Sequence, residues 1–327
     1  MNDSGILKFS QLLVAFELDN ANSVSNSEIA KQSFESVMQS AIEFKQFNAI
    51  PVTIFIITSD TPAELLRDFF EEKERITDVN FQYSVNDSHS YFGTKNVMTA
   101  FAGNNDVIVF CDSDCVYEKH HLQNMVKALT NSSASVVYGM TYANLFNATS
   151  FQSIAALCWQ FPPESIGYVT GWGGNRWANN LAVRSLVLKS NPFPDLQISR
   201  LRNAQLKIER VLWEETLIES GLEITEVDSK CWHLIFDSSM SLLQRHFIHG
   251  VARSTRAKLK SDSFQMQLLG TFGFVFKRAL LLIQLCLRGR VSIQNCFGAL
   301  GILFGVGIFR LGGFIITRGR FGITSRQ

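Results

Sequence analysis

Two carboxylates follow the strongest buried-strand signal in this chain. The apolar run Ile108-Val109-Phe110-Cys111 leads directly into Asp112, and Asp114 stands two residues further on. In an open α/β sheet, ligands bind at the carboxyl ends of the strands, which is where this order places both side chains. Carboxylate oxygens are hard donors that hold Mg²⁺ or Mn²⁺, and such an ion can bind a diphosphate. The segment therefore predicts a metal–nucleotide site.

The elements that must position this pair alternate between apolar runs and amphipathic stretches. A helix is expected after Asn26, others begin near Pro62 and Tyr91, and a further one ends before Gly221. Four more apolar runs predict strands, at Leu12–Phe16, Val52–Ile57, Phe81–Ser84 and Ala134–Met140. Strands that alternate with helices favour an α/β fold with a doubly wound, mostly parallel sheet and right-handed crossovers.

Charge is distributed unevenly along the chain. Eight of the 30 Lys and Arg residues, but none of the 29 Asp and Glu residues, lie after Asp262, so the tail carries +8 and the preceding part −7. This asymmetry argues against a body that binds nucleic acid and favours a tail that meets an anionic surface. The six scattered cysteines show no disulfide framework, and the N-terminus has no signal-peptide pattern. We therefore expect the body to stay in the reducing cytoplasm.

The tail contains two apolar stretches, Leu268–Leu287 and Cys296–Thr317, each about as long as the roughly 20 residues that cross a bilayer. Lys277, Arg278 and Arg310 interrupt them, and such charges are costly in hydrocarbon. At least the first stretch can therefore lie in the membrane interface instead of spanning the bilayer. A buried hairpin of a soluble protein is the alternative.

The order of these features resembles that of family 2 glycosyltransferases with the GT-A nucleotide-sugar fold. The similarity covers roughly residues 10–260 and is most specific over Gly93–Asp114. The segments that carry it are the strand ends at Glu17/Asn20 and Asp60, Lys95-Asn96 before a helix, VIVFCDSD, and GGNRWANNLAVRS with Phe193-Pro194-Asp195. The resemblance implies a cytoplasmic catalytic domain over residues 1–237, followed by a membrane-associated tail over 263–327. Residues 238–262 would form a basic amphipathic connector, with a solvated basic helix as the alternative.

The resemblance also implies which residues bind the nucleotide. Glu17 and Asp60 would line the nucleoside pocket, and Lys95 and Asn96 would contact the nucleotide from the start of their helix. Asp112 would lie near the ribose or the metal. A solvated lysine at a helix start is the alternative for Lys95.

The metal site implied by the resemblance consists of Asp112, Asp114 and His233, with Mn²⁺ or Mg²⁺ as the ion. Asp114 would ligate the metal directly. His233 stands where the family often has a histidine that faces the metal or the diphosphate, although a histidine beside Trp232 is also compatible with a core or surface position.

The general base of an inverting transfer is expected on the helix before Gly221, where it would take the proton of the acceptor hydroxyl. Glu214 and Glu215 form an acidic pair there, and Glu209 fits the family's distance to Gly221 better, so all three remain alternatives for one base. In a regular helix Glu215 would lie within an apolar stripe, and its partial burial would raise the pKa of its carboxyl. The stripe would consist of Ile208, Val211, Leu212 and Ile218. An exposed helix charge is the alternative for each glutamate.

Together these features predict a membrane-associated, metal-dependent and inverting enzyme that adds single sugars. The donor would be a nucleotide-sugar, expected to be UDP-linked, and the acceptor a lipid-linked or envelope (exopolysaccharide) glycan. Membrane lipids are expected partners and nucleic acid is not. A catalytically degenerate glycosyltransferase-like scaffold is the alternative. A nucleotidyltransferase is less favoured, because no glycine-rich, lysine-bearing loop follows the first strand.

Overall fold

The computed structural model describes residues 9–19, 26–59, 64–85, 91–145, 149–158, 161–166, 176–194, 202–234, 242–244, 246–251, 254 and 264–318. The chain divides into two units. The first consists of Met1–Thr141, Asn175–Asp195 and Glu209–Leu234, and the second of Tyr142–Gly174, Leu196–Ile208 and Ile235–Gln327.

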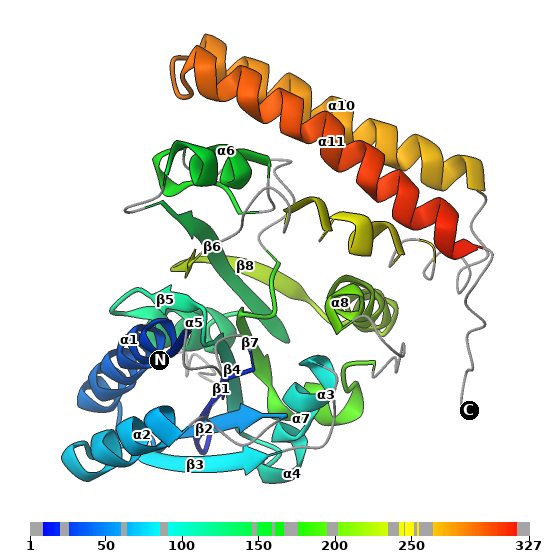
Figure 1. The fold of residues 1–327 in the computed structure, drawn as a ribbon. Helices are drawn as coiled ribbons and strands as arrows, with labels where there is room; N and C mark the ends of the chain where they lie inside the picture. Colours follow the sequence, from blue (N-terminus) through cyan, green and yellow to red (C-terminus); the bar gives the residue numbers. More distant parts are fainter. Residues whose placement is uncertain are drawn as a thin grey trace, which may run out of the picture. The chain divides into compact units, whose positions relative to one another are not determined.

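Among the described residues, eight strands form one sheet in the order β3-β2-β1-β4-β7-β6-β8-β5 (Figure 1). The first four strands of this order are parallel, as the sequence predicts. Beyond them, β7 is antiparallel to β4, β6 to β7, and β5 to β8, so the sheet is mixed. The strands are β1 (Leu12–Glu17), β2 (Val52–Thr58), β3 (Asn80–Val85), β4 (Val107–Asp112), β5 (Cys115–Tyr117), β6 (Val136–Asn144), β7 (Asn180–Arg184) and β8 (Ile224–Leu234).

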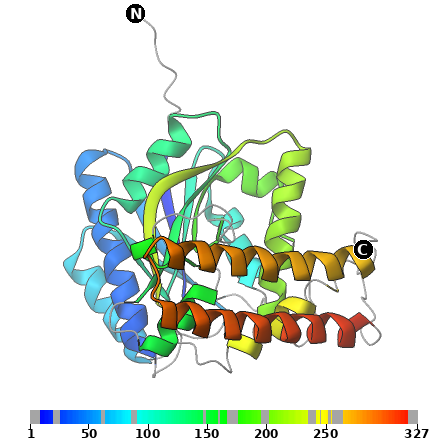
Figure 2. The same cartoon turned by 90° about the horizontal axis from the view of Figure 1, so that it is seen from above.

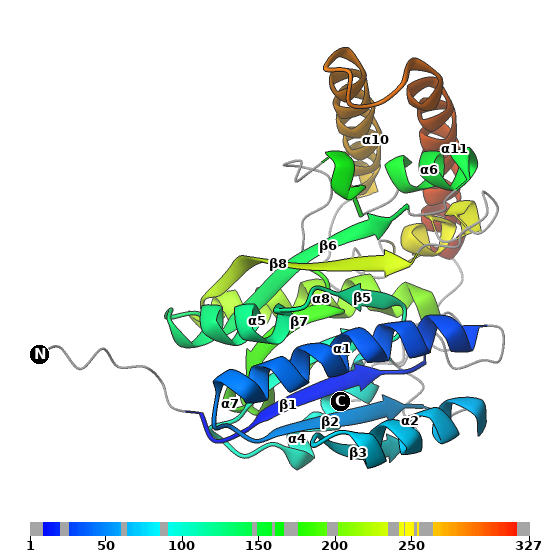
Figure 3. The same ribbon diagram turned by 90° about the vertical axis from the view of Figure 1, so that its left-hand side faces the viewer.

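Helices of the first unit lie on both faces of the sheet (Figures 2 and 3). They are α1 (Ser27–Phe47), α2 (Glu64–Ile76), α3 (Tyr91–Asn96), α4 (Met98–Phe101), α5 (His121–Thr130), α7 (Ser185–Ser190) and the second half of α8 (Arg202–Glu219). Every residue of β1, β2 and β4 is buried, which explains why these strands read as continuous apolar runs. The sheet is therefore doubly wound.

Aromatic side chains fill the space on each face of the sheet. On one face the ring of Phe34 from α1 lies 5.2 Å from that of Phe16 in β1 and 4.6 Å from that of Phe70 in α2. On the other face the ring of Phe193 lies 5.8 Å from that of Phe110 in β4 and 4.3 Å from that of Trp213 in α8. Phe193 thus connects α8 to the strand that ends at Asp112.

The second unit contains a hairpin of two long helices. Its elements are α6 (Ser150–Cys158), η2 (Glu164–Ile166), α10 (Phe264–Leu287), α11 (Ile293–Arg318) and the short helical segment at 246–251. By length and composition, two stretches among the described residues could cross a membrane: Leu268–Leu287 with a mean hydropathy of 1.6, and Ile293–Ile316 with 2.1. Within these stretches 28 % and 39 % of the residues are buried, whereas the core helix of a soluble protein is mostly buried.

Candidate functional site

The carboxyl ends of β1, β2 and β4 meet at one edge of the sheet. Glu17 ends β1 and Asp112 ends β4, and the two are register partners on neighbouring parallel strands. Oδ1 of Asp19 accepts hydrogen bonds of 2.7 Å from Oγ1 of Thr58 and from the backbone N–H of Ser59, which ties the end of β2 to this edge. The sequence thus folds so that three carboxylates lie at the ends of adjacent strands.

Asp112 is fixed by two side chains of α3. Tyr91 and Lys95 are four residues apart and so lie on one side of the helix. The Lys95 Nζ lies 2.7 Å from Oδ1 of Asp112, and the Tyr91 hydroxyl donates to Oδ2 at 2.6 Å. The backbone N–H of Asp112 also donates to the Tyr117 hydroxyl at 2.7 Å. Burial raises the pKa of Asp112, and the charge of Lys95 opposes this shift.

Glu17 is fully buried at this edge. Burial, and next the charge of Asp112, raise the pKa of the Glu17 carboxyl well above its usual range. Its Oε1 accepts a hydrogen bond of 3.1 Å from the backbone N–H of Asp19. Within the part of the chain that the structure describes, its buried Oε2 has no hydrogen-bond partner.

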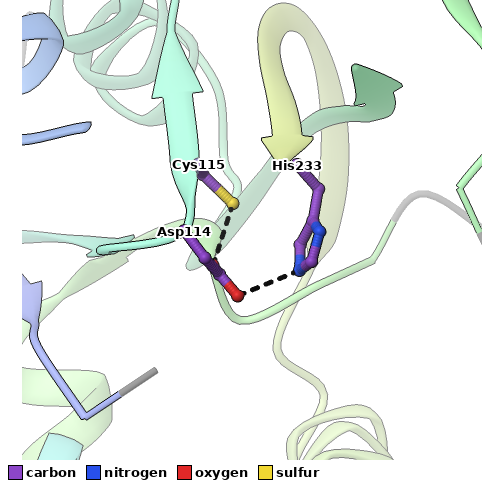
Figure 4. A group of neighbouring side chains, drawn as sticks. All are labelled: Asp114, Cys115 and His233. Carbon is purple, nitrogen blue, oxygen red and sulfur yellow. Dashed lines mark hydrogen bonds and ion pairs between the residues drawn. The ribbon is translucent and has the colours of Figure 1, made fainter. Parts of the chain in front are cut away.

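Asp114 and His233 lie side by side just beyond β4 (Figure 4). Antiparallel pairing of β5 with β8 places Cys115 opposite His233, and the backbone N–H of Leu234 donates to the carbonyl of Asp114 at 2.8 Å. As a result, Nε2 of His233 lies 3.1 Å from Oδ2 of Asp114. One ligand atom from each of Asp114, Cys115 and His233 lies within 4.8 Å of the others.

This donor set fits a divalent ion that is shared with a diphosphate. A carboxylate oxygen and an imidazole nitrogen can bind the ion and leave its other positions to phosphate oxygens. Cys115 is a poor third ligand for a hard ion, because burial raises the pKa of its thiol. Its sulfur also accepts a hydrogen bond of 3.0 Å from Nδ2 of Asn179. Asp114 and His233 are thus the fitting pair.

Of the other expected nucleotide ligands, Asn96 has a different role and Asp60 lies outside the described residues. The Asn96 amide donates to the carbonyl of Phe193 at 2.8 Å and accepts from the Phe193 N–H at 2.9 Å. Both ends of the amide are therefore used to fasten the Phe193 segment. The helix expected to begin near Tyr91 is divided at Val97, whose N–H donates to the carbonyl of Thr94.

The apolar stripe expected around Glu215 is wrong. Ile218 is 58 % exposed and Glu215 is partly exposed, whereas Glu209, Trp213 and Leu217 are fully buried. Trp213 sets this rotation of α8, because its ring stacks on Phe193 and its Nε1 donates to the carbonyl of Asn191 at 2.7 Å.

The two remaining candidates for the base therefore have different surroundings. Oε1 of Glu214 lies 3.7 Å from Nε of Arg210, so a neighbouring cation accompanies this carboxylate. Burial and the charge of Glu214 raise the pKa of Tyr138 on β6. Glu209 is the acid on the buried side of α8.

Comparison with known proteins agrees with this geometry. Residues 53–170, which include Lys95, Asp112 and Asp114, match the sequence model described as Glycosyl transferase family 2. This segment, about a third of the chain, is similar to family 2 glycosyltransferases. No curated protein matches it in sequence.

A solved structure of similar fold supports the same grouping. Mannosyltransferase PcManGT from Pyrobaculum calidifontis, in complex with GDP-Man and Mn²⁺, has a TM-score of 0.54 at 10 % identity, over 93 % of this chain and 88 % of that one. Its likeness identifies a GT-A-like core. S. aureus TarS 1-349 with UDP gives 0.44 at 11 % identity over 96 % and 94 % of the two chains. GalNAc-T7 with UDP, GalNAc and Mn²⁺ gives 0.45 at 9 % over 76 % and 52 %.

Sequence reasoning missed two tyrosines of this candidate site. Tyr91 could have been found from its spacing of four residues to Lys95. Tyr117 had no such signal: its hydroxyl accepts from the Asp112 N–H and donates to the carbonyl of Asn179 at 2.7 Å, a contact that only the fold creates.

Proposed function

We propose that this glycosyltransferase uses Mn²⁺ or Mg²⁺ to transfer a sugar from a UDP-sugar, with inversion and one sugar at a time. The acceptor would be a lipid-linked or envelope glycan. The observation that carries the proposal is the 3.1 Å contact between Asp114 and His233. It lies directly beyond the strand end where Glu17 and Asp112 are buried together.

Each residue of the edge has a separate task in this proposal. Asp114 and His233 would hold the ion, which when bound would stabilise the charge that develops on the leaving diphosphate. Glu17 would line the nucleoside pocket, where its Oε2 would accept a hydrogen bond from an N–H of the nucleobase. A carboxylate has about four acceptor positions, so Asp112 can still accept a ribose hydroxyl while Lys95 and Tyr91 keep it in place.

We propose Glu209 as the general base, with Glu214 and Glu215 as the alternatives. Its buried position on α8 supports this choice, because carboxylates are rarely buried unless they are paired or belong to a functional site. The base would take the proton of the acceptor hydroxyl as the hydroxyl attacks the anomeric carbon. The domain division at 237 and 262 and the cytoplasmic side of the catalytic domain belong to the same proposal.

The experiment is a calorimetric titration of UDP into the full-length protein, with Mn²⁺ and then with EDTA. We expect binding with Mn²⁺ and its loss with EDTA or in Asp114→Asn, and weaker binding in His233→Gln. Asp78→Asn, at a fully exposed carboxylate, is the matched control and should bind normally. Equal binding of UDP with and without EDTA would contradict the metal role. A GDP titration belongs to the same series, because PcManGT was solved with GDP-Man; preference for GDP would overturn the uridine donor.

A further inference from the structure

The helix α11 has one buried and one exposed side, and the exposed side is apolar. The exposed side is a continuous stripe that consists of Ile293, Phe297, Phe304, Ile308 and Ile315. The opposite side buries Cys296, Ala299, Leu303, Val306, Arg310 and Phe314. A helix on the surface of a soluble protein has its polar side outward, so this pattern is inverted.

The helix α10 repeats the inverted pattern. Its exposed side consists mainly of Leu269, Phe272, Phe276, Leu280, Ile283 and Leu287, which are 42–84 % exposed. Arg278 of α10 and Arg310 of α11 are instead buried, and their guanidinium carbons lie 5.7 and 4.5 Å from the centre of the Phe274 ring. Apolar groups outward and charged groups inward are typical of helices that contact lipid.

The buried side of α11 is covered along the helix by other segments of the same unit. Gly298 contacts Ile154 of α6, Gly305 lies next to Leu243, and Gly313 packs against the backbone of Phe247. From Gly298 to Gly313 the helix rises about 22 Å, at 1.5 Å per residue. If α11 crossed a hydrocarbon core of about 30 Å, these covering segments would have to enter the core with it.

Both ends of α11 are tied to segments on its covered side. Near the hairpin turn, Nη1 of Arg290 donates to the carbonyl of Ile166 at 2.6 Å, and the neighbouring Glu164 is exposed. At the other end, Gly250 packs against the backbone of Arg310. In a hairpin that crosses a bilayer, the turn and the open end lie on opposite sides of the bilayer. Because the turn is bonded to Ile166, crossing would carry the exposed Glu164 through the hydrocarbon.

We infer that the hairpin of α10 and α11 is a flat anchor, which lies parallel to an anionic bilayer with its exposed stripes in the boundary between headgroups and acyl chains. The turn supports a lipid partner: Arg288 and Arg290 are exposed, Lys277 lies beside the stripes, and no Asp or Glu follows Asp262. A second copy of the chain fits less well, because these basic groups would repel each other. The inference rests on the proposed membrane attachment and not on sugar transfer.

The first test is sedimentation of the full-length protein with vesicles of phosphatidylcholine, with and without phosphatidylglycerol. We expect binding that anionic lipid strengthens, and binding at least ten-fold weaker in the double variant Phe304→Ser/Ile308→Ser. The control is Ile76→Ser at an exposed apolar residue of α2, which should bind vesicles normally. The inference would be overturned if the wild-type chain did not bind vesicles, or if it formed a dimer that buries the stripes.

The second test separates a flat from a spanning hairpin. An environment-sensitive fluorophore is attached to Phe297→Cys, Phe304→Cys or Ile315→Cys in a Cys286→Ala background, because Cys286 is the one native cysteine that is not buried. Depth-dependent quenching by lipids with quenchers at different carbons should give one shallow depth for all three positions. A depth that changes along the helix would overturn the flat anchor but leave attachment intact. UDP binding by calorimetry, measured on the same variants, reports separately on the sugar-nucleotide site.

Discussion

The Lys95 Nζ lies 2.7 Å from Oδ1 of Asp112, and the two side chains are only 0 % and 6 % exposed. Glu17, the register partner of Asp112, is buried beside them. Lys95 is therefore the counter-charge for two neighbouring carboxylates, and Coulombic attraction to Lys95 opposes the rise in pKa of both. The ion pair has a structural as well as a functional consequence, because a buried carboxylate without its cation is strongly destabilising.

Replacement of Lys95 tests this relationship. We expect Lys95→Met to lower the free energy of unfolding by about 3–5 kcal/mol, the usual effect of removing one partner of a buried ion pair. Urea denaturation followed by fluorescence measures the change. Lys45→Met, which removes an ion pair with the exposed Asp78, is the control and should have a much smaller effect. Similar losses in the two variants would mean that Lys95 is not needed to neutralise the buried carboxylates.

The three glutamates of α8 can be ranked by turnover. We expect Glu209→Gln to lower kcat by about 10²–10⁴-fold, the contribution that is typical of a general base. UDP affinity should stay within about two-fold, because no bond to the nucleotide is removed. Glu215→Gln, at a partly exposed position, should keep most of the activity, and so should Glu214→Gln. A large loss of kcat in Glu215→Gln alone would assign the base to Glu215.

His121 makes the first unit sensitive to acid. Burial lowers the pKa of His121 from 6.5 to about 3, and its Nδ1 lies 2.9 Å from Oγ of Ser229. Between these two pH values the unfolded chain binds a proton that the folded chain does not, so stability is fully present above about pH 6.5 and is lost as the pH falls toward 3.

The measurement is the free energy of unfolding against pH. His121→Gln should flatten the acid limb of this curve, because glutamine cannot gain the proton. If His121→Gln retained the full slope between pH 6 and 4, titration of the carboxylates alone would account for the acid sensitivity.

The parts of the site that lie close together in sequence were predictable. Asp112 and Asp114 follow a continuous apolar run, and such a run at this length indicates a buried parallel strand. The structure confirms the strand and places both acids at its end. Position and residue type were sufficient here, because strand, turn and carboxylates lie within eight residues.

The partners of these acids could not be derived from local pattern. His233 lies 3.1 Å from Asp114 only because β5 pairs with β8 in one register, and a shift of one residue would turn His233 away. The rotation of α8 was misjudged for a related reason. Its apolar residues surround most of the helix, so the stacking of Trp213 on Phe193, and not the pattern, decides which side is buried.

The packing of α11 against residues 246–251 predicts opposite effects on stability for two glycine-to-alanine substitutions in this helix. A Cβ on Gly313 would overlap the carbonyl oxygen of Phe247, and backbone atoms cannot move aside as a flexible side chain can. A Cβ on Gly301 meets nothing within 4 Å.

Alanine favours a helix over glycine by about 1 kcal/mol, so Gly301→Ala should be neutral or stabilising. Gly313→Ala gains the same propensity but must separate the two helices, which costs about 1–3 kcal/mol or more. Thermal unfolding in detergent should therefore show a lower midpoint for Gly313→Ala than for Gly301→Ala. Equal midpoints would mean that the segment at 246–251 is not packed on α11, and the covered side on which the flat anchor depends would be lost with it.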